Sequence, residues 1–122
     1  MREEGWELVE SIDEEPAPVS RLELVSFLRR GESYVSGETM RERVREEGAS
    51  LGQRQAEYLR VHQEEIPSEW REFYLVLPGT VWRDRDGDLY VPYLYWHGGR
   101  WYMLFHRLER DWYSNGRLVS RK

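Results

Sequence analysis

Two runs of alternating side chains, joined by the glycine pair Gly98-Gly99, constrain the fold more than any other part of the chain. They read YVPYLYWH before the glycines and RWYMLFHR after them. Successive side chains of a β-strand point to opposite faces, and two such runs joined by two glycines predict a β-hairpin. With Gly98 and Gly99 as the loop, His97 pairs with Arg100, and the pairing continues down to Tyr93 with Leu104.

This register sorts the hairpin side chains onto two faces. One face is apolar and contains Pro92, Leu94, Trp96, Trp101, Met103 and Phe105. The other contains Tyr93, Tyr95, His97, Arg100, Tyr102, Leu104 and His106. Tyrosine, histidine and arginine combine large rigid area with polar tips, which is typical of binding surfaces. If helices covered both faces, the tyrosines would be core; about two substantial helices are too few for that, so we expect an exposed tyrosine face.

The first 70 residues are acidic and predict mainly helices. Residues 1–19 carry seven acids followed by Pro-Ala-Pro, which predicts a flexible or loosely docked arm that Trp6 could anchor. Residues 20–30 predict a short helix ending at Gly31, with an alternating strand as the other interpretation. A surface helix is expected from Ser36 or Gly37 to Gly48, and another from residue 51 to the stop at Pro67.

From residue 71 the hydrophobic period changes from 3.6 to 2, so residues 71–122 predict strands. The run FYLVL is typical of a buried strand, and the Asp86-Gly87 and Asn115-Gly116 pairs each predict a hairpin turn. The expected fold class is α+β: helices of residues 20–70 packed on a twisted antiparallel sheet of residues 71–122, forming one domain after the arm.

Composition narrows the classes of function. The chain has no cysteine, no apolar run approaching a membrane span, and no apolar leader core in MREEGWELVE, which predicts a cytoplasmic location, with export left open. The net charge of −5 hides an asymmetry: residues 1–72 carry 18 acidic and 10 basic side chains, and the remainder carries 5 and 8. The excess of basic side chains in the predicted sheet is too small to predict nucleic-acid binding from charge alone.

No set of residues predicts a cofactor, a metal or a catalytic centre. Asp84, Asp86 and Asp88 lack the glycine and glutamate spacing of a calcium loop and favour a polar turn. His97 and His106 lie at opposite ends of the hairpin, roughly 20 Å apart at ~3.3 Å per residue, so they cannot share a zinc ion. Nucleophile, nucleotide-fingerprint and phosphate-loop motifs are absent, which argues against an enzyme.

The last 30 residues resemble the variable regions of ligand-binding proteins that are diversified by retroelements. The resemblance rests on a framework of Leu94, Trp96, Gly99, Arg100, Trp101, Phe105, Leu108, Trp112, Arg117 and Leu118. Alternating with these are positions where adenine mutagenesis of an asparagine codon would give the residue present, with Asn115 still asparagine: Tyr93, Tyr95, His97, Tyr102, Leu104, His106, Tyr113 and Asn115. The resemblance implies a compact C-type-lectin-like fold and a partner chosen by the variable residues. The same framework is also similar to that of small bacterial proteins of unassigned function.

These observations lead to one expected function and two alternatives that use the same face; a small enzyme, which would need a concave pocket holding a carboxylate or histidine with a shifted pKa, is a further alternative. We expect a non-catalytic binding module that recognises a protein or other macromolecule through Tyr93, Tyr95, His97, Arg100, Tyr102, Leu104, His106, Tyr113 and Asn115. The first alternative is single-stranded nucleic acid or glycan, whose rings would stack on the tyrosines near Arg100 and Arg107. The second is a homodimer contact on the same face.

Overall fold

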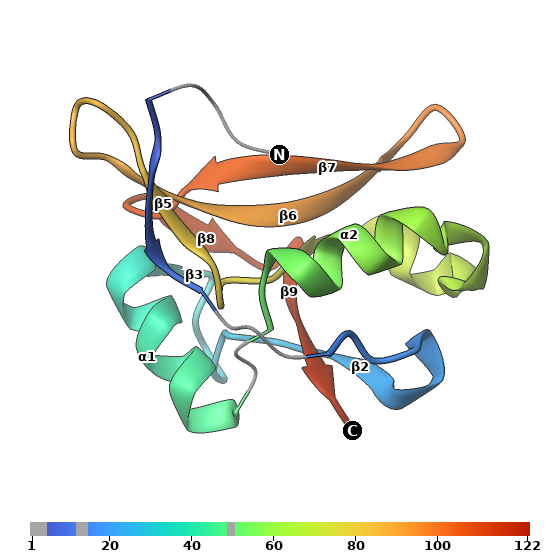
Figure 1. The fold of residues 1–122 in the computed structure, drawn as a ribbon. Helices are drawn as coiled ribbons and strands as arrows, with labels where there is room; N and C mark the ends of the chain where they lie inside the picture. The colour runs from blue at the N-terminus through green and yellow to red at the C-terminus, as the bar shows by residue number, and fades with distance from the viewer. Residues whose placement is uncertain (1–4, 12–14, 49–50) are drawn as a thin grey trace.

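The computed structural model describes residues 5–11, 15–48 and 51–122, and it confirms a mixed α+β architecture of two helices and a large curled sheet (Figure 1). The helices are α1 (Gly37–Glu47) and α2 (Gln53–Val61). The strands are β1 (Glu7–Glu10), β2 (Leu22–Val25), β3 (Tyr34–Ser36), β4 (Tyr74–Val76), β5 (Val81–Arg83), β6 (Leu89–His97), β7 (Arg100–Arg107), β8 (Asp111–Tyr113) and β9 (Gly116–Arg121). Short 3-10 turns at Val19–Arg21, Gln63–Glu65 and Ser68–Glu72 join them.

Across these described ranges, seven strands form the main sheet in the order β1-β5-β6-β4-β9-β2, with β7 paired to β6, while β3 and β8 form a separate two-stranded sheet. The prediction of a purely antiparallel sheet was wrong in one place, because β4 and β9 run parallel. The predicted final hairpin was also wrong. The turn at Ser114 and Asn115 sends β8 to β3 and β9 to β4 and β2.

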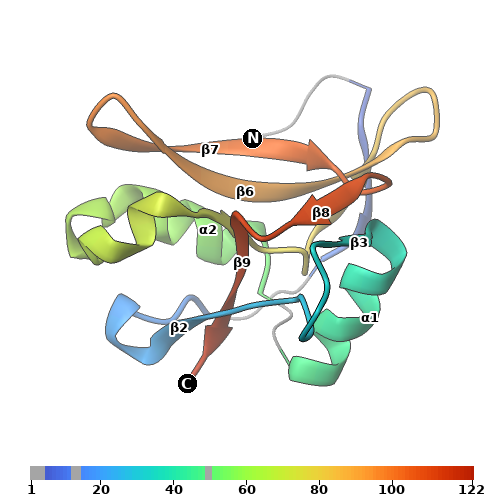
Figure 2. The ribbon, with the colours of Figure 1, turned by 180° about the vertical axis from the view of Figure 1, so that it is seen from behind.

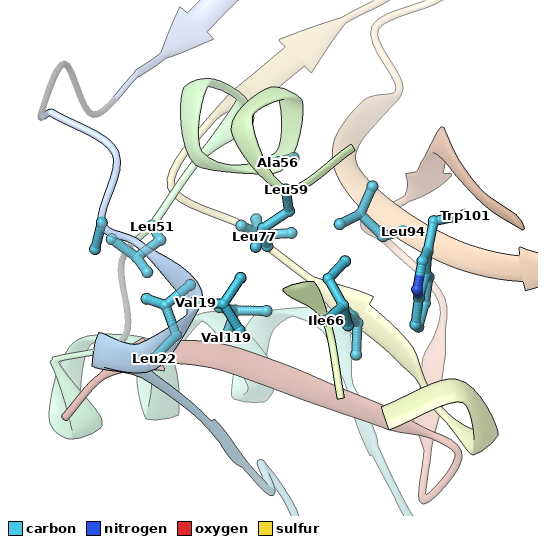
Figure 3. Close-up of a cluster of buried hydrophobic side chains, with 12 residues drawn as sticks. Val19, Leu22, Leu51, Ala56, Leu59, Ile66, Leu77, Leu94, Trp101 and Val119 are labelled. Carbon is cyan, nitrogen blue, oxygen red and sulfur yellow. The ribbon is translucent and has the colours of Figure 1, made fainter. Parts of the chain in front are cut away.

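A helix packs on each face of the main sheet, contrary to the expectation from the sequence, but the end of the tyrosine face near the Gly98-Gly99 turn is exposed, as expected. In β4, Leu75 belongs to a core cluster with Ala56 and Leu59 of α2. Figure 3 shows Ala56 and Leu59 within this cluster. The next residue, Val76, belongs to a second cluster with Met40 and Val44 of α1. The sheet strand β9 accordingly runs between the two helices in both Figure 1 and Figure 2. Two short helices suffice because each covers a different part of the curled sheet.

Strand structure also extends into the region predicted to be helical. Residues 22–25 form β2, which pairs with β9, so the strand interpretation of this segment was right and the helix was wrong. Alternation explains the outcome, since Leu22 and Leu24 contribute to the α2-side cluster and Val25 to the α1-side cluster. Residues 34–36, which lie between the two segments predicted to be helical, form β3.

Helix α1 confirms its predicted boundaries through its caps. The hydroxyl of Ser36 accepts a hydrogen bond from the backbone N–H of Thr39 at 3.2 Å, and Gly48 ends the helix with a left-handed φ of 67°. Helix α2 is shorter than predicted, ending at Val61 before a 3-10 turn. Its first N–H, on Gln53, donates to the hydroxyl of Thr80 at 2.8 Å, so a residue far along the chain supplies this cap.

The described part of the acidic N-terminal arm is docked on the body. Strand β1 pairs with β5, and the ring of Trp6 stacks on Tyr90 at 4.5 Å between ring centroids. Further along, Ala17 and the buried side chain of Gln55 exchange two hydrogen bonds, of 2.7 and 2.9 Å. These contacts add an edge strand to the sheet.

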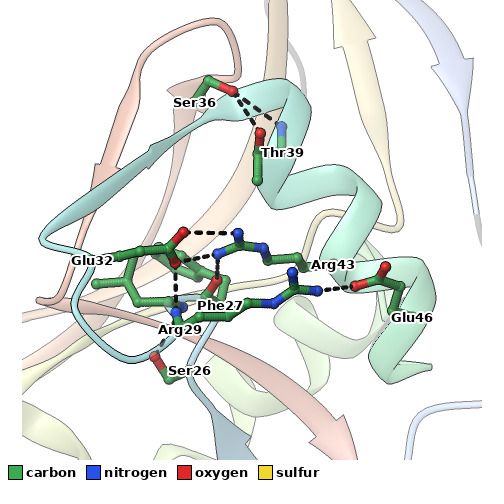
Figure 4. Close-up of polar contacts among 9 residues, drawn as sticks. Ser26, Phe27, Arg29, Glu32, Ser36, Thr39, Arg43 and Glu46 are labelled. Atoms are coloured by element: carbon green, nitrogen blue, oxygen red, sulfur yellow. Dashed lines mark hydrogen bonds and ion pairs between the residues drawn. The ribbon is translucent and has the colours of Figure 1, made fainter.

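A charged cluster ties α1 to the loop before β3 (Figure 4). Arg43, largely buried, donates to both carboxylate oxygens of Glu32 at 2.5 and 2.9 Å and to the carbonyl of Phe27 at 2.9 Å. The N–H of Arg29 also donates to Glu32. These hydrogen bonds, the one from Arg43 being the strongest, lower the pKa of Glu32 from 4.5 to about 2.

The stabilising effect of Glu32 should therefore depend on pH. Because its pKa is lower in the folded than in the unfolded chain, its contribution is present above pH 4.5 and is lost as the pH falls to about 2. We expect Glu32→Gln to unfold at lower urea concentration than wild type at pH 7, and the difference to vanish near pH 2. Urea unfolding across this range checks it, with Glu46→Gln, at the exposed pair with Arg29, as the control. A difference that stays constant with pH would contradict the assignment.

Candidate functional site

The β6–β7 hairpin has the predicted register throughout. His97 pairs with Arg100, Trp96 with Trp101, and the pairing continues to Tyr90 with Arg107. Gly98 and Gly99 form the turn with φ values of 60° and 90°, which residues other than glycine rarely adopt. The local sequence therefore determines which side chains share a face.

The tyrosine face is exposed toward the hairpin tip. Tyr95, Tyr102 and Leu104 are 43, 42 and 43 % exposed to solvent, and His97 and Arg100 are exposed beside them. These five residues are called the tip surface below. The opposite face is the core face, as predicted: Leu94 and Trp101 are buried, and Trp96, Met103 and Phe105 are partly buried.

Contacts within the tip surface hold its side chains side by side. The rings of Tyr95 and His97 stack at 5.9 Å with an angle of 10° between their planes. The guanidinium of Arg100 lies 5.3 Å from the centre of the Tyr102 ring. Cations are attracted to ring faces at this range, so Arg100 is held over the surface. The five side chains include no carboxylate, which makes the tip surface neutral to cationic although the chain is acidic.

Tyr93 and His106, predicted to be exposed, are half-buried instead. They lie where β8 crosses the sheet, and the ring of Trp112 meets His106 edge-to-face at 4.7 Å. Tyr74 of β4 completes the group, with its ring 5.6 Å from Tyr93 and 6.3 Å from His106. The second layer made by α1, β3 and β8 is the physical reason, since it covers this end of the face and leaves the tip free.

A cavity of about 230 Å³ opens at the boundary between the covered and free parts of the face. Its lining consists of Tyr74, Tyr93, Tyr95 and His106. Burial raises the pKa of Tyr74 and of Tyr93, so both phenols keep their protons at neutral pH. Burial, helped by the positive charge of Arg110, lowers the pKa of His106 below 6.5. The rings of Tyr74, Tyr93 and His106 are consequently uncharged at pH 7.

Two predicted binding residues do not join this surface. Tyr113 follows Trp112 in β8 and points away from the core, where its ring lies 5.8 Å from that of Tyr34. Asn115 is exposed in the turn after β8, and its carbonyl accepts the backbone N–H of Tyr74 at 3.0 Å. Their spacing in the sequence continued the alternation, but the chain leaves the hairpin after Arg107.

The edge of β7 is covered near the tip by a side chain. The N–H of Trp101 donates to the amide oxygen of Gln63 at 2.9 Å, and the amide nitrogen of Gln63 lies 3.4 Å from the carbonyl of Trp101. This pair of contacts resembles that of a neighbouring strand. It holds the turn after α2 against the hairpin and fixes the orientation of the tip.

Two residues of the site, Tyr74 and Arg110, were not predicted from the sequence. Tyr74 reads as one residue of a continuous apolar run, and its place beside Tyr93 depends on the pairing of Val76 with Tyr93. Arg110 lies in the loop before β8, where nothing in the sequence ties it to His106. Alternation alone put Tyr74 and Val76 on one face of their strand, but only the long-range register says what that face meets.

In the described ranges, no group of three or more histidine or acidic side chains could hold a metal ion. The carboxylate of Asp84 accepts the N–H groups of Asp86 and Asp88 at 3.0 and 2.9 Å, as a turn does. Among the described helices, none has the length and apolar character needed to cross a membrane.

Comparisons with known proteins identified no relative of this chain. No protein-family model matches the chain, and neither a curated protein nor a solved structure is significantly similar to it.

Proposed function

We propose that the protein is a non-catalytic binding module and that the tip surface docks a protein ligand. The observation that carries the proposal is the contiguous exposure of Tyr95, Tyr102 and Leu104 on two paired strands, beside His97 and Arg100. Large aromatic and aliphatic groups left in water at one place mark interaction sites. Tyrosine and arginine are also the residue types that most often dominate binding energy.

Rigidity of the surface supports the same proposal. Its backbone belongs to a regular hairpin whose other face is anchored by Leu94 and Trp101 in the core. Stacking and cation–π contacts already order the side chains in the free protein. A pre-organised surface loses less conformational entropy on binding than a flexible one does.

A random peptide library displayed on phage can test the proposed surface. Peptides selected on wild type should bind at least ~30-fold more weakly to the triple variant Tyr95→Ser, Tyr102→Ser, Leu104→Ser, as the loss of several central contacts predicts. Urea unfolding should show little change, since all three side chains are exposed. The matched control is Tyr34→Ser with Val61→Ser, which removes side chains of 52 and 67 % exposure elsewhere. Equal binding to wild type and the triple variant would refute the proposal.

Single-stranded nucleic acid is the second candidate ligand. The tip surface favours it in one respect, because Arg100 lies over Tyr102 and no carboxylate accompanies them. Such a ligand would be released steeply by salt, whereas peptide binding would change little. Titration of a fluorescent oligothymidylate at about 50 and 200 mM salt separates the two.

Sedimentation at varied concentration would reveal a homodimer on the same face, which the triple variant should abolish.

Diversification by a retroelement, with a C-type-lectin-like fold, remains part of the proposal. Burial of framework residues supports it, notably Leu94, Trp101, Leu108, Trp112 and Leu118. Exposure of proposed variable residues supports it too, notably Tyr95, His97, Tyr102, Leu104, Tyr113 and Asn115. The genomic test is a nearby near-duplicate of the region encoding these residues, differing mainly at adenines and accompanied by a reverse transcriptase gene.

A further inference from the structure

The cavity beside the tip surface has a geometry that the docking proposal does not use. The rings of Tyr74, Tyr93 and His106 are separated by 5.6, 6.3 and 5.7 Å, and their planes meet at 72°, 77° and 63°. Three planes close to perpendicular, with centres about 6 Å apart, can all face a single point about 4 Å from each centre, which is within the range of cation–π attraction. Tyr95 lines the same cavity as a fourth ring.

We propose that this four-ring cavity binds a methylated or quaternary ammonium group. Ring faces carry partial negative charge, so a cavity lined only by rings attracts a cation and repels an anion. At about 230 Å³ it is smaller than a drug-sized site, and a compact head group suits it.

Charge and hydration select a methylated cation over a bare one. The four lining residues include no carboxylate that would replace the water lost by a primary ammonium. Methyl groups weaken hydration and contact the ring carbons, so a methylated cation loses less on entering. Arg110 is the nearby cation that acts on His106, and it opposes binding.

The inference goes beyond the docking surface and shares only Tyr95 with it. Choline and its uncharged isostere 3,3-dimethylbutan-1-ol are suitable probes, titrated at constant ionic strength while the ring resonances of Tyr93 and His106 are followed by NMR. We expect choline to shift these resonances saturably, with a Kd at least about threefold lower than that of the alcohol. Equal Kd values would show a merely apolar cavity and overturn the proposal, as would resonances that neither probe moves.

Variants identify the residues that bind. Tyr74→Phe keeps the ring and should retain choline binding, whereas Tyr74→Leu should weaken it at least about threefold. Arg110→Gln, in an exposed loop, should tighten it, and this outcome does not depend on a buried substitution. If both Arg110→Gln and Tyr74→Leu bound choline with the wild-type affinity, this result would overturn the proposed site. Tyr102 and Leu104 are intact in every variant, so failure here leaves the docking surface standing.

The pH dependence follows from the groups around His106, which are Tyr74, Tyr93, Trp112 and Arg110. Among these only His106 changes charge in mildly acidic solution. Its protonation would place a cation in the cavity wall, so choline affinity should fall as the pH is lowered below 6.5. A short peptide carrying trimethyl-lysine is compared with its unmethylated form and with choline; tighter binding of the methylated peptide than of choline indicates a modified protein side chain as the source, and weaker binding indicates a free small cation. Tighter binding of the unmethylated peptide would overturn the preference for methylation.

Discussion

Replacing Trp112 by alanine is expected to lower the free energy of unfolding by roughly 3–5 kcal/mol, the usual loss for a buried tryptophan. The side chain is fully buried between α1 and the main sheet, where it meets Phe27 at 6.3 Å and His106 at 4.7 Å edge-to-face. Its indole N–H also donates to the carbonyl of Leu108 at 3.0 Å. The substitution therefore removes apolar burial and leaves a buried carbonyl without this donor.

Urea unfolding measures this loss, and two variants calibrate it. Trp112→Phe retains a ring but loses the hydrogen bond, so it should cost about 1–3 kcal/mol. Tyr113→Ala, one residue along on the exposed side of β8, should change stability by under about 0.5 kcal/mol. A loss below about 1 kcal/mol for Trp112→Ala would mean that the α1 layer contributes little to the core, contrary to its burial. Choline binding by this variant should also weaken, because Trp112 positions His106.

Replacing Gly37 by alanine is the second large expected effect. A Cβ atom at this position would lie 1.8 Å from the carbonyl oxygen of Leu108 and 3.3 Å from the indole nitrogen of Trp112. Helix α1 begins at Gly37, so the added methyl would push the helix off the sheet. Alanine normally stabilises a helix relative to glycine by roughly 0.5–1 kcal/mol. Here the clash should dominate and cost about 1–3 kcal/mol or more, as overpacking does.

The neighbouring Glu38→Ala is the matched control, since it makes the same kind of substitution on the exposed side of the same turn. It should shift the urea midpoint only slightly. A Gly37→Ala protein as stable as wild type would show that α1 does not approach Leu108 so closely. Because a Cβ added at Gly37 would meet the Leu108 carbonyl that the Trp112 indole contacts, the two effects should not add in the double variant.

Local patterns were sufficient where neighbours along the chain fix the outcome. Alternation plus a two-glycine turn gave the hairpin register, and Ser36 and Gly48 gave the ends of α1. The helix prediction for segment 22–25 was wrong because the structure of this segment depends on a strand far along the chain. Its apolar spacing fits a short helix as well as a strand, and only pairing with β9 favours the strand. The same dependence on distant strand pairing explains why β3 and the separation of β8 from β9 were not predicted.

By itself, the sequence determined the two faces of the β6–β7 hairpin and the chemical character of each, because strand alternation and turn geometry act over a few residues. The tertiary structure alone decided how far the tyrosine face is covered. Contacts from Trp112 of β8 and Tyr74 of β4 bury part of Tyr93 and His106, while Tyr95, Tyr102 and Leu104 lie beyond them in solvent. The physical reason is that coverage depends on contacts between segments distant in the chain, and the curl of the sheet sets where those contacts end.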